Sequence, residues 1–174
     1  IDLYKNKKKD KSLCVFNVTM QNHNPYNFDY VGDVKVTDFS VSSQVEQYLS
    51  LMRKSDDALK ELITYFKKSD EPAIILVFGD HQPHLPDSFY EKLFGKNPVQ
   101  FSREDSMKEH LIPFMIWANY DIGEENIERT SINYLSSLLL EKAGLKMSDY
   151  NRYLLELYKE IPSLSATGFY DKNG

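Results

Sequence analysis

The apolar residues of the chain occur either in short unbroken runs or at helical spacing, and the two patterns predict strands and helices. Three runs, at residues 13–19, 73–78 and 112–118, show no regular alternation with polar residues. Such runs are typical of strands that are buried on both faces of a sheet. We therefore predict three strands, the first of which would bury the thiol of Cys14.

A long amphipathic helix is predicted between the first two strands. From Ser43 to Phe66 the apolar residues fall on one face, and charged residues fall on the opposite face. Ser43 and Glu46 have the spacing of a capping box, and Pro72 cannot continue a helix. Glu46 and Glu61 are expected on the solvated face of this helix.

Two shorter helices are predicted in the last third of the chain. Apolar residues at helical spacing from Ile132 lead to Gly144, the residue type favoured just after a helix C-terminus. Ser148 can cap a final helix, which Pro162 closes. Residues 163–174 show no clear period.

The order of these elements indicates the fold class. A strand, a helix and a second buried strand form a βαβ unit, and such crossovers are nearly always parallel. The 174 residues are enough for one ordinary domain. We expect an α/β fold with a mostly parallel sheet that is flanked by helices.

Composition narrows the classes of function. A hydrophobic fraction of 41% and an aromatic fraction of 13% are those of a folded protein. The net charge of −5 offers no basic face for nucleic acid, so nucleic acid is not an expected partner. The lysines between residues 5 and 11 are expected in a solvated loop. No apolar stretch approaches the ~20 residues of a membrane span, so the piece itself is expected to be soluble. Its start at Ile1 suggests that an upstream part was removed.

Polar side chains follow each of the predicted strands. His23 comes after the first strand, Asp80 and His81 follow the second, and residues 119–121 follow the third. Ligands of open parallel sheets bind outside the carboxyl ends of the strands, so we expect these groups to point towards one side. A carboxylate beside an imidazole suits a Zn, Mn or Mg ion that carries an anionic oxygen substrate.

Asp80 and His81 also have a structural explanation, in which Asp80 begins a turn and His81 is a hydrogen-bonded histidine at the surface. From these two residues alone, this explanation is favoured over a metal site. His84 and His110 are expected to be exposed or packing residues. The sequence contains no glycine-rich phosphate loop, HExxH motif, GxSxG elbow or paired-cysteine zinc site. Serine-triad and nucleotide-binding enzymes therefore gain no support.

Several segments, taken in order, resemble one group of enzymes. Residues 16–23, 78–83 and 113–121 are similar to segments of lipoteichoic acid synthases and related phosphoglycerol transferases, and the similarity continues through residues 133–140 and 168–174. These enzymes belong to the sulfatase branch of the alkaline phosphatase superfamily. The resemblance implies a partial alkaline phosphatase/sulfatase-like sandwich, in which residues 1–174 are the C-terminal part of one catalytic domain.

The resemblance also implies an activity and a set of residues. In that group a divalent metal, usually manganese, assists a threonine that attacks phosphatidylglycerol, and glycerophosphate passes to a polyglycerophosphate or glycan acceptor. By motif, Asp80 and His81 correspond to metal ligands and His23 to the histidine that contacts the substrate. The resemblance places the nucleophile, a further metal ligand and the membrane helices upstream. We therefore expect no catalytic nucleophile in these residues, no turnover by them alone, and a parent protein at the extracytoplasmic face of the cell membrane.

Two other functions stay open at this point. The superfamily also hydrolyses sulfate and phosphate esters on a shared metal scaffold, and the fold alone does not distinguish hydrolysis from transfer. A non-catalytic α/β interaction module, with Asp80 and His81 as turn residues, is the third possibility.

Overall fold

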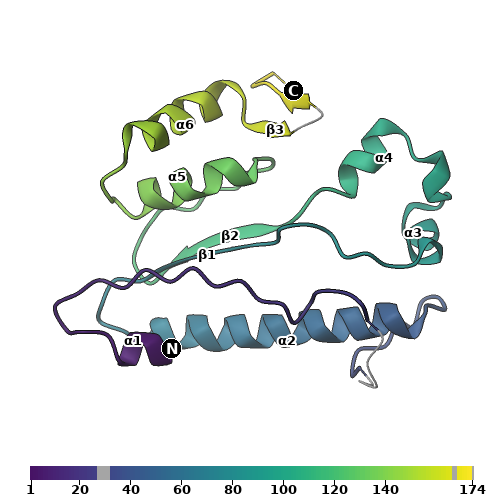
Figure 1. The fold of residues 1–174 in the computed structure, drawn as a ribbon, viewed down its shortest axis with the longest axis horizontal. Coiled ribbons are helices and arrows are strands. Elements are labelled where there is room, and N and C mark those ends of the chain that lie inside the picture. The colour runs from purple at the N-terminus through teal and green to yellow at the C-terminus, as the bar shows by residue number, and fades with distance from the viewer. Residues whose placement is uncertain (27–31, 166–167, 174) are drawn as a thin grey trace. The chain divides into compact units, whose positions relative to one another are not determined.

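The computed structural model describes residues 1–26, 32–165 and 168–173. Helices and short strands alternate along the chain in a mixed α/β arrangement (Figure 1). The elements are α1 Asp2–Lys5, α2 Ser43–Phe66, β1 Ile74–Phe78, α3 Asp87–Phe94, the 3-10 helix η1 Pro98–Gln100, α4 Arg103–Lys108, β2 Phe114–Ala118, α5 Ile132–Lys142, α6 Asp149–Glu160, β3 Ser163–Ser165 and β4 Gly168–Tyr170.

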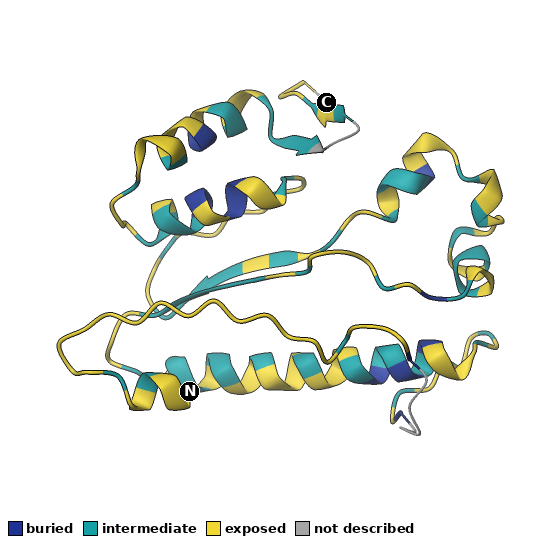
Figure 2. Cartoon of the chain, viewed as in Figure 1, coloured by how far each residue is buried: buried dark blue, intermediate teal, exposed yellow. Residues whose placement is uncertain are grey.

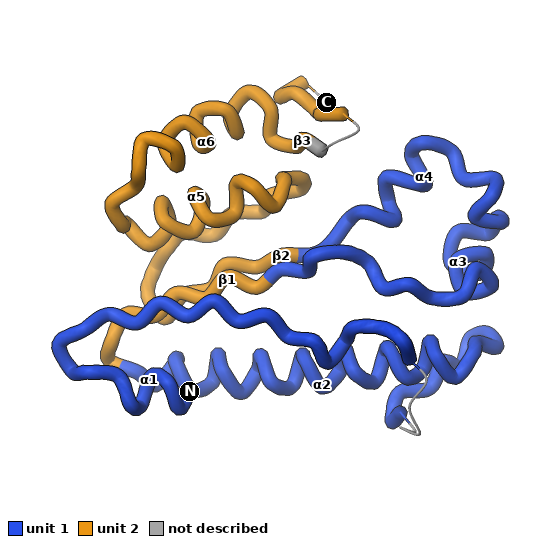
Figure 3. The backbone as a smooth tube through the Cα atoms, viewed as in Figure 1, with its two compact units in different colours: residues 1–69, 78–113 blue, residues 70–77, 114–174 orange. Residues whose placement is uncertain are grey.

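The chain divides into two compact units (Figure 3). Unit 1 contains residues 1–69 and 78–113, and unit 2 contains residues 70–77 and 114–174. Each unit has its own cluster of buried apolar side chains.

Helix α2 is the longest element of unit 1, and its bounds confirm the helix predicted from Ser43 to Phe66. Val45 on its first turns is fully buried and packs in a cluster with Tyr26 and Leu85. The predicted capping box is wrong, because Ser42 rather than Ser43 occupies the N-cap position. Glu46 is not on a solvated face either. It pairs with Lys35, with 2.6 Å between Nζ and Oε2.

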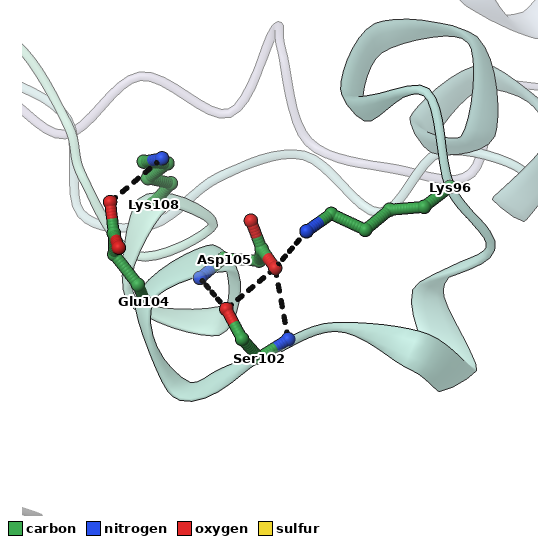
Figure 4. A network of polar contacts seen from close by, with 5 residues as sticks. All are labelled: Lys96, Ser102, Glu104, Asp105 and Lys108. Carbon is green, nitrogen blue, oxygen red and sulfur yellow. Dashed lines mark hydrogen bonds and ion pairs between the residues drawn. The ribbon is translucent and has the colours of Figure 1, made fainter.

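A capping box that the sequence analysis did not identify begins helix α4 (Figure 4). Ser102 Oγ accepts a hydrogen bond from the Asp105 backbone N–H, and the Asp105 carboxylate accepts one from the Ser102 N–H. Lys96 adds an ion pair of 2.5 Å to the same carboxylate. The buried Asp105 side chain therefore has a partner for its charge. The hydrogen bond from Lys96, followed by those from Ser102, holds the pKa of this carboxyl well below its usual range.

The first predicted strand is not present. Residues 12–20, all of them described, form neither strand nor helix, and every one of them is exposed (Figure 2). Phe16 is 82% exposed, and the thiol of Cys14 is exposed as well, which corrects its predicted burial. An apolar run becomes a buried strand only when a neighbouring strand satisfies its backbone, and this run pairs with no strand of the described residues. Without it, α2 does not form part of a βαβ unit.

The second and third predicted strands are confirmed as β1 and β2, which form a two-stranded sheet. Their direction differs from the prediction. The Asn119 N–H donates to Ala73 O at 3.1 Å, and the Gly79 N–H donates to Pro113 O at 3.4 Å. The residue before β1 thus pairs with the residue after β2, so the two strands are antiparallel. The predicted parallel sheet is not observed here, because an apolar run carries no information about strand direction.

Two helices form the core of unit 2. Helices α5 and α6 lie side by side (Figure 1) and bury one apolar cluster. The ring of Tyr134 is fully buried, and its hydroxyl donates to Ile161 O at 2.8 Å. The predicted stop and cap are confirmed, since Gly144 has a φ of 62° after α5 and Ser148 Oγ accepts from the Asn151 N–H at the start of α6. The cluster contains Tyr134, Leu135, Leu138, Leu154 and Leu155.

The final residues, which show no sequence period, form the antiparallel pair β3–β4. In the register of this pair Ser163 lies opposite Tyr170. None of the described helices combines the length and the apolar character that crossing a membrane requires.

Candidate functional site

Asp80 and His81 lie in the loop that follows β1, and both side chains are exposed. The His81 N–H donates to Asp80 Oδ1 at 3.0 Å, which fixes the orientation of the carboxylate. The second oxygen, Oδ2, then lies 3.5 Å from Nε2 of His81. One oxygen and one ring nitrogen are thus held next to each other at the surface of unit 1.

The hydrogen bond of the His81 ring determines which of its nitrogens can bind a ligand. Nδ1 lies 2.8 Å from the backbone oxygen of Gln82. A carbonyl oxygen can only accept, so Nδ1 carries the proton of the neutral ring and Nε2 keeps its lone pair. The lone pair and the Asp80 oxygen are therefore available side by side.

The spacing of these two atoms fits a shared metal ion. Nitrogen and oxygen ligands lie about 2.0 to 2.2 Å from zinc, and two such ligands of a tetrahedral ion are roughly 3.3 to 3.6 Å apart. The 3.5 Å between Asp80 Oδ2 and His81 Nε2 lies in this range. Within the described ranges, no cluster of three or more His, Cys, Asp or Glu side chains could hold a metal ion, so these residues offer two ligands rather than a full set.

His23 comes from a distant part of the sequence and lies beside His81. The two rings meet edge to face, with centroids 6.4 Å apart. Nδ1 of His23 is 2.6 Å from Asn24 O, so its Nε2 is also the nitrogen with the lone pair when the ring is neutral. The structure therefore brings together the three residues that the sequence analysis selected.

Asn22 and Tyr26 hold the loop that carries His23 against the rest of unit 1. The Asn22 side chain donates to Ser55 Oγ on α2 at 2.9 Å. The hydroxyl of Tyr26, a residue of the buried cluster, donates to Asn22 O at 2.7 Å. Burial, with smaller contributions from Tyr48 and Tyr90, raises the pKa of Tyr26 to about 12. These contacts fix the backbone on both sides of His23.

The prediction that residues 119–121, at the end of the third predicted strand, point towards the same side as Asp80 and His81 is wrong. The Asn119 side chain accepts from the Ala73 N–H at 2.8 Å and donates to Glu71 O at 2.9 Å. Ala73 precedes β1, whereas Asp80 follows it, so Asn119 lies at the other end of the strand. This correction follows directly from the antiparallel direction of β2.

Asp80 and His81 line a pocket together with residues that were not predicted to belong to the site. Three of these are His84, Glu109 and His110. No motif could have identified them. Glu109 and His110 follow a separate short helix and reach the pocket only through the folding of residues 87–110.

The chain is similar in sequence to one family model and to two known proteins. The family model described as sulfatase matches residues 1–145. A "Putative cyclic beta-1,2-glucan modification protein" of Rhizobium meliloti (strain 1021) is 30% identical over 171 residues, which cover 91% of this chain and 26% of that protein. The "Capsular polysaccharide biosynthesis protein RkpI" of the same strain is 34% identical over 77 residues, which cover 44% of this chain and 13% of that protein. The chain thus spans about a quarter of the first relative. No solved structure gives a significant match.

Proposed function

Since this chain belongs to the sulfatase family, we propose that it forms part of a divalent-metal-dependent enzyme that transfers glycerophosphate from a phosphatidylglycerol-type lipid to a glycan. The observation that carries this proposal is the 3.5 Å separation of Asp80 Oδ2 and His81 Nε2, with Nδ1 of the same ring bonded to Gln82 O. This geometry favours two ligands of one ion over two unrelated turn residues.

Asp80 and His81 would hold the ion, which we propose to be manganese, with magnesium or zinc as alternatives. A bound divalent ion would stabilise negative charge on the phosphoryl oxygens. The ring of His23 lies beside His81. In its imidazolium form, in which Nε2 also carries a proton, it would donate that proton or a hydrogen bond to a substrate oxygen. The further ligand and the nucleophile would come from the additional length that the relatives have.

The names of the two relatives concern glycans, one a cyclic beta-1,2-glucan and the other a capsular polysaccharide. This favours a glycan acceptor over a polyglycerophosphate chain. It also suits a reaction at the extracytoplasmic face of the cell membrane, where donor lipid and envelope glycan meet.

Manganese titration by calorimetry tests the metal site. The chain should bind manganese weakly, because its described residues offer two ligands, and a form extended to the length of the relatives should bind it tightly. Asp80→Ala should abolish the tight binding. Asp57→Ala, which removes a carboxylate that is 63% exposed on α2, is the matched control and should leave it unchanged. Equal binding by the Asp80→Ala and unsubstituted extended proteins would contradict the proposal.

A donor assay with the extended protein tests the reaction. Phosphatidylglycerol and a neutral glucan should give diacylglycerol and a glucan that carries glycerophosphate. Release of free glycerophosphate without glucan labelling would instead identify a phosphodiester hydrolase.

A further inference from the structure

A pocket of about 390 Å³ lies next to Asp80 and His81, entirely within unit 1. Its lining comes from three parts of the chain. The loop after β1 contributes the stretch from Asp80 to Leu85, helix α3 contributes Asp87 and Tyr90, and the turn after α4 contributes Glu109 and His110. A volume of this size lies in the usual range for small-molecule sites.

Direct contacts hold the walls of the pocket together. The Gln82 side chain donates to Leu111 O, which joins the loop to the segment after α4. The Tyr90 hydroxyl donates to Pro83 O at 2.6 Å, which joins α3 to the same loop. Leu85 is only 4% exposed and belongs to the buried cluster of unit 1. The pocket is therefore a structured part of the unit rather than a gap between loose segments.

The charge of the lining does not suit an anionic ligand. The described residues that line the pocket include the carboxylates of Asp80, Asp87 and Glu109 but no lysine or arginine. Burial raises the pKa of Tyr90, and the negative charges of Glu109 and Asp87 raise it further. In the absence of a bound cation, these three carboxylates would repel a free phosphate group.

The same side chains suit a ligand that is rich in hydroxyl groups. Carboxylates accept hydrogen bonds from hydroxyls, and a neutral imidazole offers one donor and one acceptor. Nδ1 of His110 lies 2.7 Å from Ser106 O, so Nε2 of its neutral ring is an acceptor. Several acceptors thus line one pocket, beside a part-buried aromatic ring.

We propose that this pocket binds a neutral saccharide and that it is the acceptor site of the enzyme. Its position next to Asp80 and His81 would bring a saccharide hydroxyl close to the place where the phosphoryl group is held. The role as acceptor site rests on the proposed function, whereas the binding of a neutral saccharide rests on the pocket alone.

The test uses a neutral β-linked glucose trisaccharide and, as the anionic comparison, glycerol 1-phosphate. Each is titrated into the chain while the ring proton signals of the four histidines are followed by NMR. The trisaccharide should shift the His84 and His110 signals more than that of His23, and glycerol 1-phosphate should bind there more weakly. His84→Ala and Glu109→Ala should each weaken trisaccharide binding about five- to tenfold, the loss expected for one hydrogen bond. Glu104→Ala, a variant of an 80% exposed carboxylate on α4, is the matched control and should bind normally.

Two results would overturn the proposal. One is tighter binding of glycerol 1-phosphate than of the trisaccharide, and the other is trisaccharide binding that neither His84→Ala nor Glu109→Ala weakens. If the trisaccharide binds as expected but the extended protein releases no diacylglycerol, the binding site stands and only the proposed transfer is contradicted.

Discussion

The ring of His23 meets the ring of His81 edge to face, with 6.4 Å between their centroids. In the sequence, His23 is separated from His81 by the whole of α2 and β1. The loop bearing His23 is held to α2 through Asn22, and the loop bearing His81 begins at the end of β1. The position of one ring relative to the other therefore depends on how unit 1 folds.

We predict that His23→Gln separates substrate chemistry from metal binding. In the extended protein, diacylglycerol release should fall about 10²- to 10⁴-fold, the usual effect of losing a general acid or base. Manganese affinity should not change, because Asp80 and His81 remain. A parallel loss of manganese binding would make His23 a ligand and would contradict its proposed role.

We predict that Tyr26→Phe destabilises unit 1. The Tyr26 hydroxyl donates to Asn22 O, and Tyr26 is 5% exposed, so its removal leaves a carbonyl without this partner. The free energy of unfolding in urea at neutral pH should fall by about 1 to 3 kcal/mol. Tyr150→Phe, at a position that is 66% exposed, is the control and should change it little.

Tyr26 should also make the free energy of unfolding depend on pH in the alkaline range. Burial raises its pKa in the folded chain to about 12, whereas tyrosine in an unfolded chain titrates near pH 10. Its contribution to stability is therefore complete below about pH 10 and is lost as the pH rises towards 12. The slope of unfolding free energy against pH in this window should be smaller in Tyr26→Phe, and identical slopes would contradict the assignment.

We predict an acid-sensitive contribution from Asp105. Its hydrogen bond from Lys96, followed by those from Ser102, holds the pKa of the folded carboxyl well below the ~3.9 of an unfolded chain. The stability from this group is present above about pH 4 and is lost as the pH falls below that value, because the unfolded state then binds more protons. In Asp105→Asn, the free energy of unfolding should therefore fall less between pH 7 and pH 3. In Glu104→Gln, on the same helix, it should fall as in the unsubstituted chain.

We predict that Gly32→Ala destabilises the chain through one contact with α2. A Cβ at residue 32 would lie 2.1 Å from Ser50 Oγ and 2.8 Å from Ser50 Cβ. Ser50 is almost fully buried and donates to Glu46 O at 2.7 Å, so it has little room to move. The free energy of unfolding should fall by about 1 to 3 kcal/mol, as for other overpacked sites. An unchanged urea midpoint would contradict this prediction.

Periodicity predicted the long helices well, because their apolar faces are recorded in the sequence. Helix α2 covers the predicted span from Ser43 to Phe66, although its N-cap is Ser42 and it ends before Pro72. Gly144 and Ser148 lie where the sequence placed a stop and a cap. The strands were predicted less well. Residues 13–19 have the composition of a strand, but a strand also needs a neighbour, and composition does not show whether one is present.

In the candidate site, too, the sequence predicted the local features but not those that depend on tertiary contacts. The adjacency of Asp80 and His81 is a local property of the sequence, and its geometry follows from one backbone hydrogen bond. Glu109 and His110 reach the pocket through tertiary contacts such as the one between Gln82 and Leu111, which join residues 29 positions apart. Contacts between residues so far apart leave no local sequence pattern from which they could be predicted.

The exposed apolar run at residues 13–20 affects how the protein behaves at high concentration. The run pairs with no strand in the described part of the chain, and such a backbone beside exposed side chains such as Phe16 and Val18 is a usual starting point for intermolecular β-pairing. The lysines at positions 5–11 come directly before it, and we expect their mutual repulsion to oppose such pairing. Added salt screens that repulsion. Self-association of this chain should therefore increase with ionic strength, even though its net charge is negative.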